Sequence, residues 1–249
     1  MIKSLASAAA LLVLVGLIVT SCGTTDDEVV LNFKMTYNDD PLVMFNDVEY
    51  GDGRMMQFSR VSFYISELEL TNANNTLGNI DVDFLKLSDA HLSLEDAQEG
   101  FPIVVNIDEL GSLDKLNFNI GLTADLNATT PVDYRSSSPL SRTGEYWPGW
   151  ESYIFVKFEG DIDLNGNGQY DAGETFSLHV GSNNAMRSYS FDLSDSQDSY
   201  DVTIDIAKVF NNNGTLYDID GQPRMGSLTD QTLINIKVLS DNLQGAVEL

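Results

Sequence analysis

Alternating apolar and polar residues mark most of the chain as short β-strands. Between Val29 and Tyr37 (VVLNFKMTY) apolar side chains recur at roughly every second position, which is the period of a strand with one buried face. Clusters of Asn, Asp and Gly separate this segment and those like it, as turn residues do. In residues 60–70 the alternation of apolar and polar side chains shifts by one position near Ser66, which predicts a β-bulge. The other predicted strands are residues 60–70, 80–87, 101–107, 116–122, 153–158, 175–180, 189–193 and 200–206.

Helical patterns are few. Residues 93–98 and 206–210 are each long enough for about one turn. Residues 229–243 fit either a helix capped by Thr229 or Asp230, or a strand with alternating isoleucines; we favour the helix. About nine strands with one or two short helices predict an all-β fold, an antiparallel sandwich or barrel, of which we expect the sandwich.

The start of the chain is typical of a lipoprotein signal peptide. An almost unbroken apolar run at residues 5–18 is too short to span a membrane comfortably. The four residues that end at Cys22 (VTSC) resemble a bacterial lipobox, in which the cysteine becomes the lipidated first residue of the mature chain. The expected organisation is a signal peptide at 1–21, an acidic tether at 22–28 and a single β-sandwich domain at 29–249.

Cys22 is the only cysteine, so no disulfide can form within the chain. The residue after Cys22 is Gly23 and not an aspartate, which favours transport of the lipoprotein to the outer membrane over its retention in the inner membrane. The acidic run at residues 26–28 resembles the export tag of surface lipoproteins in Bacteroidetes-type bacteria, although a solvated tether would look the same. We therefore expect a domain held at the outer membrane or cell surface through lipid on Cys22.

The net charge of the chain argues against a nucleic-acid partner. Loss of residues 1–21 removes Lys3 and leaves 12 basic against 38 acidic side chains, a net charge of −26. A surface this acidic repels nucleic-acid phosphates, so we expect no nucleic-acid partner.

The chain has two histidines, no G-x-S-x-G motif and no phosphate-binding loop, and we expect no enzymatic activity.

The sequence DLNGNGQYDAGE at residues 163–174 fits the twelve-residue calcium loop of an EF-hand. Its flanks resemble strands, so the loop is predicted to form the tip of a β-hairpin. Two of its ligands are amides, which predicts weak binding, on the order of 0.1 to 1 mM. The alternative is a polar turn without an ion. The predicted ligands are Asp163, Asn165, Asn167, the backbone carbonyl of Gln169, Asp171 through water, and both carboxylate oxygens of Glu174.

Several short motifs in a fixed order resemble the MbnP-like family, which is named for a methanobactin-associated periplasmic copper protein. This resemblance implies a secreted or lipid-anchored β-sandwich. The motifs are Asp52-Gly53 followed by residues 58–66 (FSRVSFYIS), residues 116–122 (LNFNIGL), Pro139-Leu140, residues 146–153 (YWPGWESY), Glu159-Gly160 and residues 178–182 (LHVGS).

In copper-binding members of that family, histidines and an oxidised tryptophan form the metal site. His179 matches the histidine of the family's H-x-G element, and Trp147 and Trp150 match an aromatic pair, so the resemblance implies a candidate copper site there. A second family histidine corresponds to Ala128, which follows Asn127. The alternatives are a strand histidine hydrogen-bonded within the sheet, and tryptophans that only pack.

Two functions remain open from the sequence. The first is an extracytoplasmic, lipid-anchored metal-binding protein, with calcium in the loop 163–174 and copper near His179. The second is a structural or interaction accessory lipoprotein of an outer-membrane transport system, without a transition metal. In both, lipid on Cys22 connects the protein to a membrane.

Overall fold

The computed structural model describes residues 27–107, 113–212 and 214–249. The predicted signal peptide, Cys22 and most of the acidic tether lie outside these ranges, so lipidation stays a prediction. None of the helices in the described ranges has the length and apolar content of a membrane span.

Strands dominate the fold, and all nine predicted strands are present. The strands are β1 (Asp27–Tyr37), β2 (Asp40–Pro41), β3 (Val48–Glu49), β4 (Met55–Thr71), β5 (Thr76–Leu85), β6 (Phe101–Ile107), β7 (Lys115–Ile120), β8 (Tyr146–Trp147), β9 (Ser152–Ile162), β10 (Thr175–Gly181), β11 (Arg187–Asp192), β12 (Ser199–Asp205), β13 (Asn211–Asn212), β14 (Thr215–Leu216) and β15 (Val247–Glu248). The helices are α1 (Leu94–Glu99), α2 (Ala124–Asn127), α3 (Ile206–Phe210) and α4 (Asp230–Gln244).

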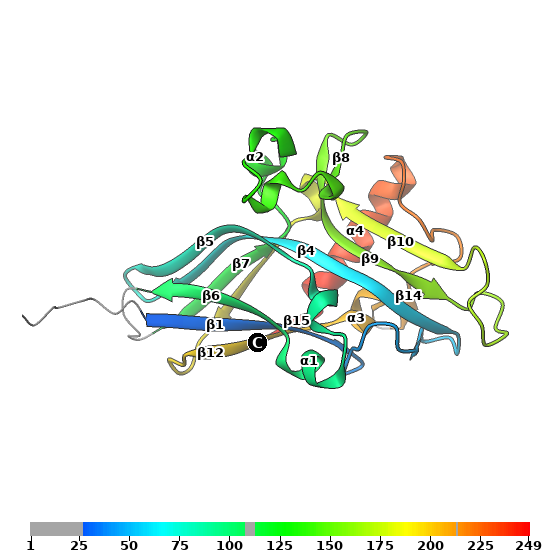
Figure 1. Ribbon diagram of the computed structural model, residues 1–249, viewed down its shortest axis with the longest axis horizontal. Coiled ribbons are helices and arrows are strands. Elements are labelled where there is room, and N and C mark those ends of the chain that lie inside the picture. Colours follow the sequence, from blue (N-terminus) through cyan, green and yellow to red (C-terminus); the bar gives the residue numbers. More distant parts are fainter. Residues whose placement is uncertain (1–26, 108–112, 213) are drawn as a thin grey trace, which may run out of the picture.

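Two sheets pack face to face, which confirms the all-β sandwich (Figure 1). The smaller sheet has the order β15-β12-β1-β2, with β6 beside β1, and the larger has the order β10-β9-β4-β7-β11, with β3 and β5 beside β4. Phe33 of the smaller sheet contacts Phe63 and Phe118 of the larger, with ring centres 6.1 and 5.6 Å apart. Such edge-to-face pairs fill the space between the sheets.

One pair of long strands differs from the expected antiparallel pattern. β1 and β12 run parallel, from Val30 opposite Ser199 to Thr36 opposite Asp205. More than 150 residues separate these strands in the chain, so no tight turn forces them to run in opposite directions. The predicted bulge is confirmed: the register of β4 against β7 shifts between Ser66 and Glu69.

The C-terminal segment 229–243 is helical, which confirms the favoured alternative. Thr229 caps α4 by accepting a hydrogen bond from the backbone N–H of Thr232. Ile236, Leu239 and Leu243 are buried at helical spacing, against a neighbourhood that includes β10 and β11. α4 has 15 residues, the length of the predicted segment.

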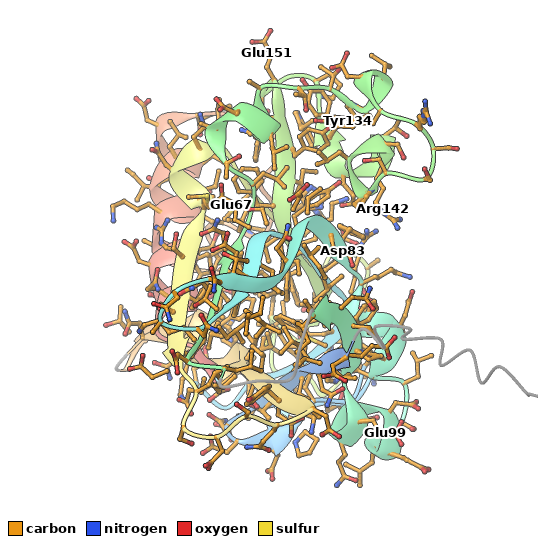
Figure 2. All side chains as sticks on the ribbon, turned by 90° about the vertical axis from the view of Figure 1, so that its left-hand side faces the viewer. Glu67, Asp83, Glu99, Tyr134, Arg142 and Glu151 are labelled. Carbon is orange, nitrogen blue, oxygen red and sulfur yellow. The ribbon has the colours of Figure 1, made fainter. Side chains whose placement is uncertain are left out.

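A long excursion between β7 and β9 covers part of the larger sheet. It contains α2 and β8 together with short 3-10 turns, among them η3 (Pro139–Ser141) and η4 (Thr143–Glu145), and it rises above the sheet in Figure 1. In Figure 2, Tyr134 and Arg142 lie within it and Glu151 lies at its outer end. The hydroxyls of Tyr64 and Tyr153 donate to the carbonyls of Pro139 and Leu140, which ties the excursion to the sheet.

His91 is part of the core. It is fully buried, its Nδ1 lies 2.7 Å from the carbonyl oxygen of Leu42, and its Nε2 accepts from the N–H of Met35 at 3.3 Å. These partners fix a neutral tautomer with the proton on Nδ1. Burial lowers the pKa of His91 below its usual value.

Replacing His91 with Gln tests this structural role. The folded-state pKa is lowered, so the contribution of His91 to stability is complete above its unfolded pKa of about 6.5 and is lost as the pH falls below it. His91→Gln should be less stable than the parent at pH 7.5, and its unfolding free energy should change less between pH 6.5 and 5. Urea titrations over this range measure both effects, and parallel pH profiles for the two proteins would contradict the assignment.

Candidate functional site

The hairpin of β9 and β10 carries both groups of predicted site residues. In its register Thr175 lies opposite Asp161, Ser177 opposite Glu159 and His179 opposite Lys157. Residues two apart on a strand point to the same face, so polar side chains line one face of this pair. The loop 163–174 forms the tip of the hairpin, at the right of Figure 1, as the sequence predicts.

Two carboxylates in the loop are buried. Asp163 is 3% exposed and Glu174 is 7% exposed. Asp163 accepts hydrogen bonds from the backbone N–H groups of Asn167 and Gly168, and Glu174 accepts from those of Asn165 and Asp171. Within the ranges that the structure describes, neither carboxylate forms an ion pair with a basic side chain. Buried charges are normally paired or coordinate a metal.

The other predicted ligands lie within the same turn. The side-chain oxygens of Asn165 and Asn167 accept from the backbone N–H groups of Asn167 and Gln169. Asp171 accepts from the side-chain amides of Asn165 and Asn167, at 3.1 and 2.9 Å. Gly168 has a φ of +78°, a conformation that suits glycine at this sharp turn. The loop therefore brings five predicted side-chain ligands into one network.

The donor set in this loop is mixed. In the described part of the chain, no three His, Cys, Asp or Glu side chains are grouped to hold a metal by themselves. A cation in the loop would need the amide oxygens of Asn165 and Asn167 and the carbonyl of Gln169, in addition to the carboxylates. Calcium accepts carbonyl and amide oxygens as well as carboxylates, so the residues present suit it.

His179 lies on β10, and one of its two ring nitrogens has polar partners while the other has none among the described residues. Its Nε2 is 2.8 Å from a carboxylate oxygen of Glu159 and 3.0 Å from the hydroxyl of Ser177. Its Nδ1 is buried and has no hydrogen-bond partner among the described residues. Burial lowers the pKa of His179, although the hydrogen bond to Glu159 opposes that shift.

The two tryptophans lie beside this histidine. Trp147 ends β8 and packs edge-on against His179, with ring centres 6.0 Å apart, and against Trp150 at 5.5 Å. The Nε1 of Trp150 is also buried without a described partner. A Cβ atom at Gly181 would lie 2.6 Å from the carbonyl oxygen of Tyr153 and 3.5 Å from the Trp150 ring. Glycine two residues after His179 therefore makes room for the neighbouring strand and the indole.

The structure thus brings His179, Trp147 and Trp150 together, as the resemblance implies. It does not add the second histidine to them, because both ring nitrogens of His91 bond to backbone groups of Leu42 and Met35.

A buried charge cluster holds the aromatic pair over the sheet. Glu145, only 6% exposed, receives a hydrogen bond from Arg60 on one carboxylate oxygen. The ammonium of Lys157 lies 2.9 Å from the other and donates to the carbonyl of Gly144 at 2.7 Å. That second oxygen receives no well-directed hydrogen bond, so the contact with Lys157 is an ion pair. This cluster fixes η4, which leads directly into Trp147.

Sequence reasoning did not single out Arg60, Glu145 or Lys157, nor did it assign Glu159 a contact with His179. One signal was present: the apolar strand YIFVKFEG places Lys157 and Glu159 at alternate positions, which implies a charged face on a strand otherwise typical of the core. The buried side chain of Asn127 bonds to Ser152, Tyr153 and Asn183.

Comparisons with known proteins agree with this architecture. A family model described as MbnP matches residues 26–225, which confirms the resemblance seen in the motifs. The solved structure of MbnP from Methylosinus trichosporium superposes with a TM-score of 0.54 at 14% sequence identity, covering 74% of this chain and 77% of that one. This likeness shows a shared fold. No curated protein sequence matches the chain.

Removing the carboxylate of Glu145 tests the charge cluster. Glu145→Ala leaves Lys157 buried without its counter-charge, and the loss of one partner from a buried pair costs about 3–5 kcal/mol. The matched control is Lys86→Ala, which breaks the exposed pair with Asp89 and should cost less than about 1 kcal/mol. Urea denaturation of both variants measures the difference, and equal losses would show that the cluster does not hold the excursion.

Proposed function

The chain belongs to the MbnP family, and from this membership we propose an extracytoplasmic, lipid-anchored metal-binding protein. It holds calcium in the loop 163–174 and copper beside His179. Lipid on Cys22 attaches it to the outer membrane or cell surface. Family membership supports the extracytoplasmic, metal-associated role in general terms, whereas each ion is proposed from the residues of this chain.

The proposal of calcium binding rests on one observation: Asp163 and Glu174 are buried without a basic partner in the described ranges. Each carboxylate accepts only backbone N–H groups in the loop, so no basic side chain among the described residues neutralises either negative charge at the hairpin tip. Since a divalent cation would neutralise both, its expected effect is to stabilise the loop and the strands on either side.

Calcium should raise the thermal stability of the protein. If the dissociation constant is on the order of 0.1–1 mM, 10 mM calcium raises the free energy of unfolding by about 1.4–2.7 kcal/mol. Differential scanning calorimetry with and without calcium measures this shift. Magnesium at the same concentration should have a smaller effect, because it prefers a strict octahedral site and keeps its waters.

Two variants locate the calcium effect. Glu174→Gln should abolish the calcium-dependent shift, whereas Asp195→Asn, at an exposed carboxylate outside the loop, should retain it. If the parent protein gains no stability from calcium, or if Glu174→Gln gains as much as the parent, the loop does not bind the ion.

The proposal of copper binding rests on Nδ1 of His179, which has no hydrogen-bond partner among the described residues. An imidazole with one nitrogen hydrogen-bonded to a carboxylate and the other free is the usual arrangement of a metal-binding histidine. His179 would hold the ion through Nδ1, and Trp147 and Trp150 would form an apolar wall beside it. The described part of the chain offers no second imidazole at this position, so further ligands would be oxygen donors.

Metal analysis of protein purified without chelators tests copper. The protein should take up about one equivalent of copper, His179→Ala should lose this uptake, and Glu174→Gln should keep it because its carboxylate lies in the loop. Inductively coupled plasma measurements after titration and desalting report the ratio.

The single imidazole beside Trp147 is the observation that favours the second candidate, an accessory lipoprotein of an outer-membrane transport system without a transition metal. Absence of copper from the parent protein, before and after titration, would leave this candidate in place of the copper proposal. A retained calcium shift would then be compatible with it, since calcium serves only to order the hairpin.

A further inference from the structure

The outer face of the larger sheet carries a polar hollow of about 650 Å³, away from both candidate metal sites. It extends across β5, β4, β7 and β11, and its volume is within the range of small-molecule sites. Its polar lining consists of three carboxylates, three amides and two serine hydroxyls. Among the described residues, no lysine, arginine or histidine contributes to this lining. The hollow therefore offers hydrogen-bond acceptors and has no positive charge to attract an anion.

The pairing of the strands explains how these side chains come together. Phe118 of β7 packs against the smaller sheet, so its neighbours Asn117 and Asn119 point to the opposite, outer face. Glu69 lies opposite Asn117 in the register of β4 against β7. The same glutamate lies opposite Asn79 in the register of β4 against β5. One row across the sheet therefore carries a carboxylate between two amides.

The β-bulge in β4 adds further carboxylates beside this row. Between Ser66 and Glu69 the strand has one residue more than the facing stretch of β7, and Glu67 there has a φ of +49°. The carboxylate of Glu67 accepts a hydrogen bond from the side-chain amide of Asn119 at 2.9 Å. On its other side, Glu67 falls opposite Asp81 of β5, because the residue pairs before and after them are in register.

The three carboxylates of the hollow lack a counter-charge. In the described ranges none of them forms an ion pair with a basic side chain. Like charges opposite one another on neighbouring strands, as in Glu67 and Asp81, destabilise a sheet. The carboxylates also do not converge on one point, since no three acidic, histidine or cysteine side chains of the described residues are grouped to hold a metal ion. The hollow is therefore suited to a ligand whose positive charges are spread along its length.

We propose that this hollow binds a linear organic polycation, a polyamine of the size of spermidine. Ammonium groups are hydrogen-bond donors only, which matches a lining of carboxylates and amide oxygens. Neighbouring strands are about 4.8 Å apart, and residues two apart on a strand are separated by about 6.7 Å. Carboxylates spaced in this way on Asp81, Glu67 and Glu69 suit ammonium groups that are joined by propyl and butyl chains.

Isothermal titration calorimetry with spermidine tests this proposal. The protein is kept at about 0.15 M salt, where screening limits general attraction to the acidic surface. Calcium is present throughout, so that the loop 163–174 does not compete for the ligand. The protein should bind about one equivalent of spermidine with a saturable isotherm. Putrescine should bind more weakly because it has fewer ammonium groups, and the neutral disaccharide sucrose should bind more weakly still.

Removing the carboxylates should weaken binding without harming the fold. The triple variant Glu67→Gln, Glu69→Gln, Asp81→Asn keeps the size of each side chain. An exposed ion pair contributes up to about fivefold in affinity, so the loss of three should raise the dissociation constant of spermidine by about tenfold or more. The thermal stability of this variant should equal or exceed that of the parent, because the opposed charges of Glu67 and Asp81 are gone.

A matched control separates the hollow from the general acidity of the surface. It neutralises three exposed carboxylates elsewhere in the chain: Glu99→Gln, Asp125→Asn and Asp195→Asn. Glu99 lies well apart from Glu67 in Figure 2. Since charges more than a Debye length from the ligand are largely screened, the control should bind spermidine within about twofold of the parent.

Three outcomes would overturn the proposal. The first is a parent protein without saturable binding of spermidine. The second is an equal loss of affinity in the two triple variants, which would show general attraction to an acidic surface. The third is binding of sucrose as tight as that of spermidine, which would show that the hollow recognises hydroxyl groups and not positive charge.

Discussion

The antiparallel pairing of β9 with β10 is the constraint on which both candidate metal sites depend. Its register places Glu159 opposite Ser177 and Lys157 opposite His179, and its tip is the loop 163–174. The two sites are therefore parts of one supersecondary unit, joined by hydrogen-bonded strands. Because the side-chain period of a strand is two, a slip of one residue would turn the charged face of the hairpin inwards and the apolar face outwards.

Buried charge distinguishes the two ends of this hairpin. Near His179 the carboxylate of Glu145 is balanced by Arg60 and Lys157, so this part of the sheet satisfies its charges without a ligand. At the tip, the buried carboxylates of Asp163 and Glu174 are held by backbone N–H groups. The first arrangement stabilises the overlying excursion, whereas the second is suited to a cation from outside.

The family relation and the local chemistry contribute different conclusions. Membership of the MbnP family agrees with the sandwich. The glycine at position 181 permits the close approach of His179, Trp147 and Trp150. Family membership does not by itself supply a complete metal site in this chain, because the other histidine, His91, bonds to backbone groups of Leu42 and Met35 and lies outside this group. The loop 163–174 and the contact between Glu159 and His179 follow from this chain's own residues.

The sequence alone determined the local elements, because their signals are local. Alternation predicted the strands, a cap at Thr229 or Asp230 predicted the start of α4, and strand-like flanks predicted the loop 163–174 as a hairpin tip. The parallel pairing of β1 with β12 and the burial of His91 depend on contacts between segments far apart in the chain, which no short pattern encodes. The same holds for the site: the sequence named His179 and the tryptophans, but only the tertiary structure decided which nitrogen of the imidazole is open, because that depends on a carboxylate from the neighbouring strand.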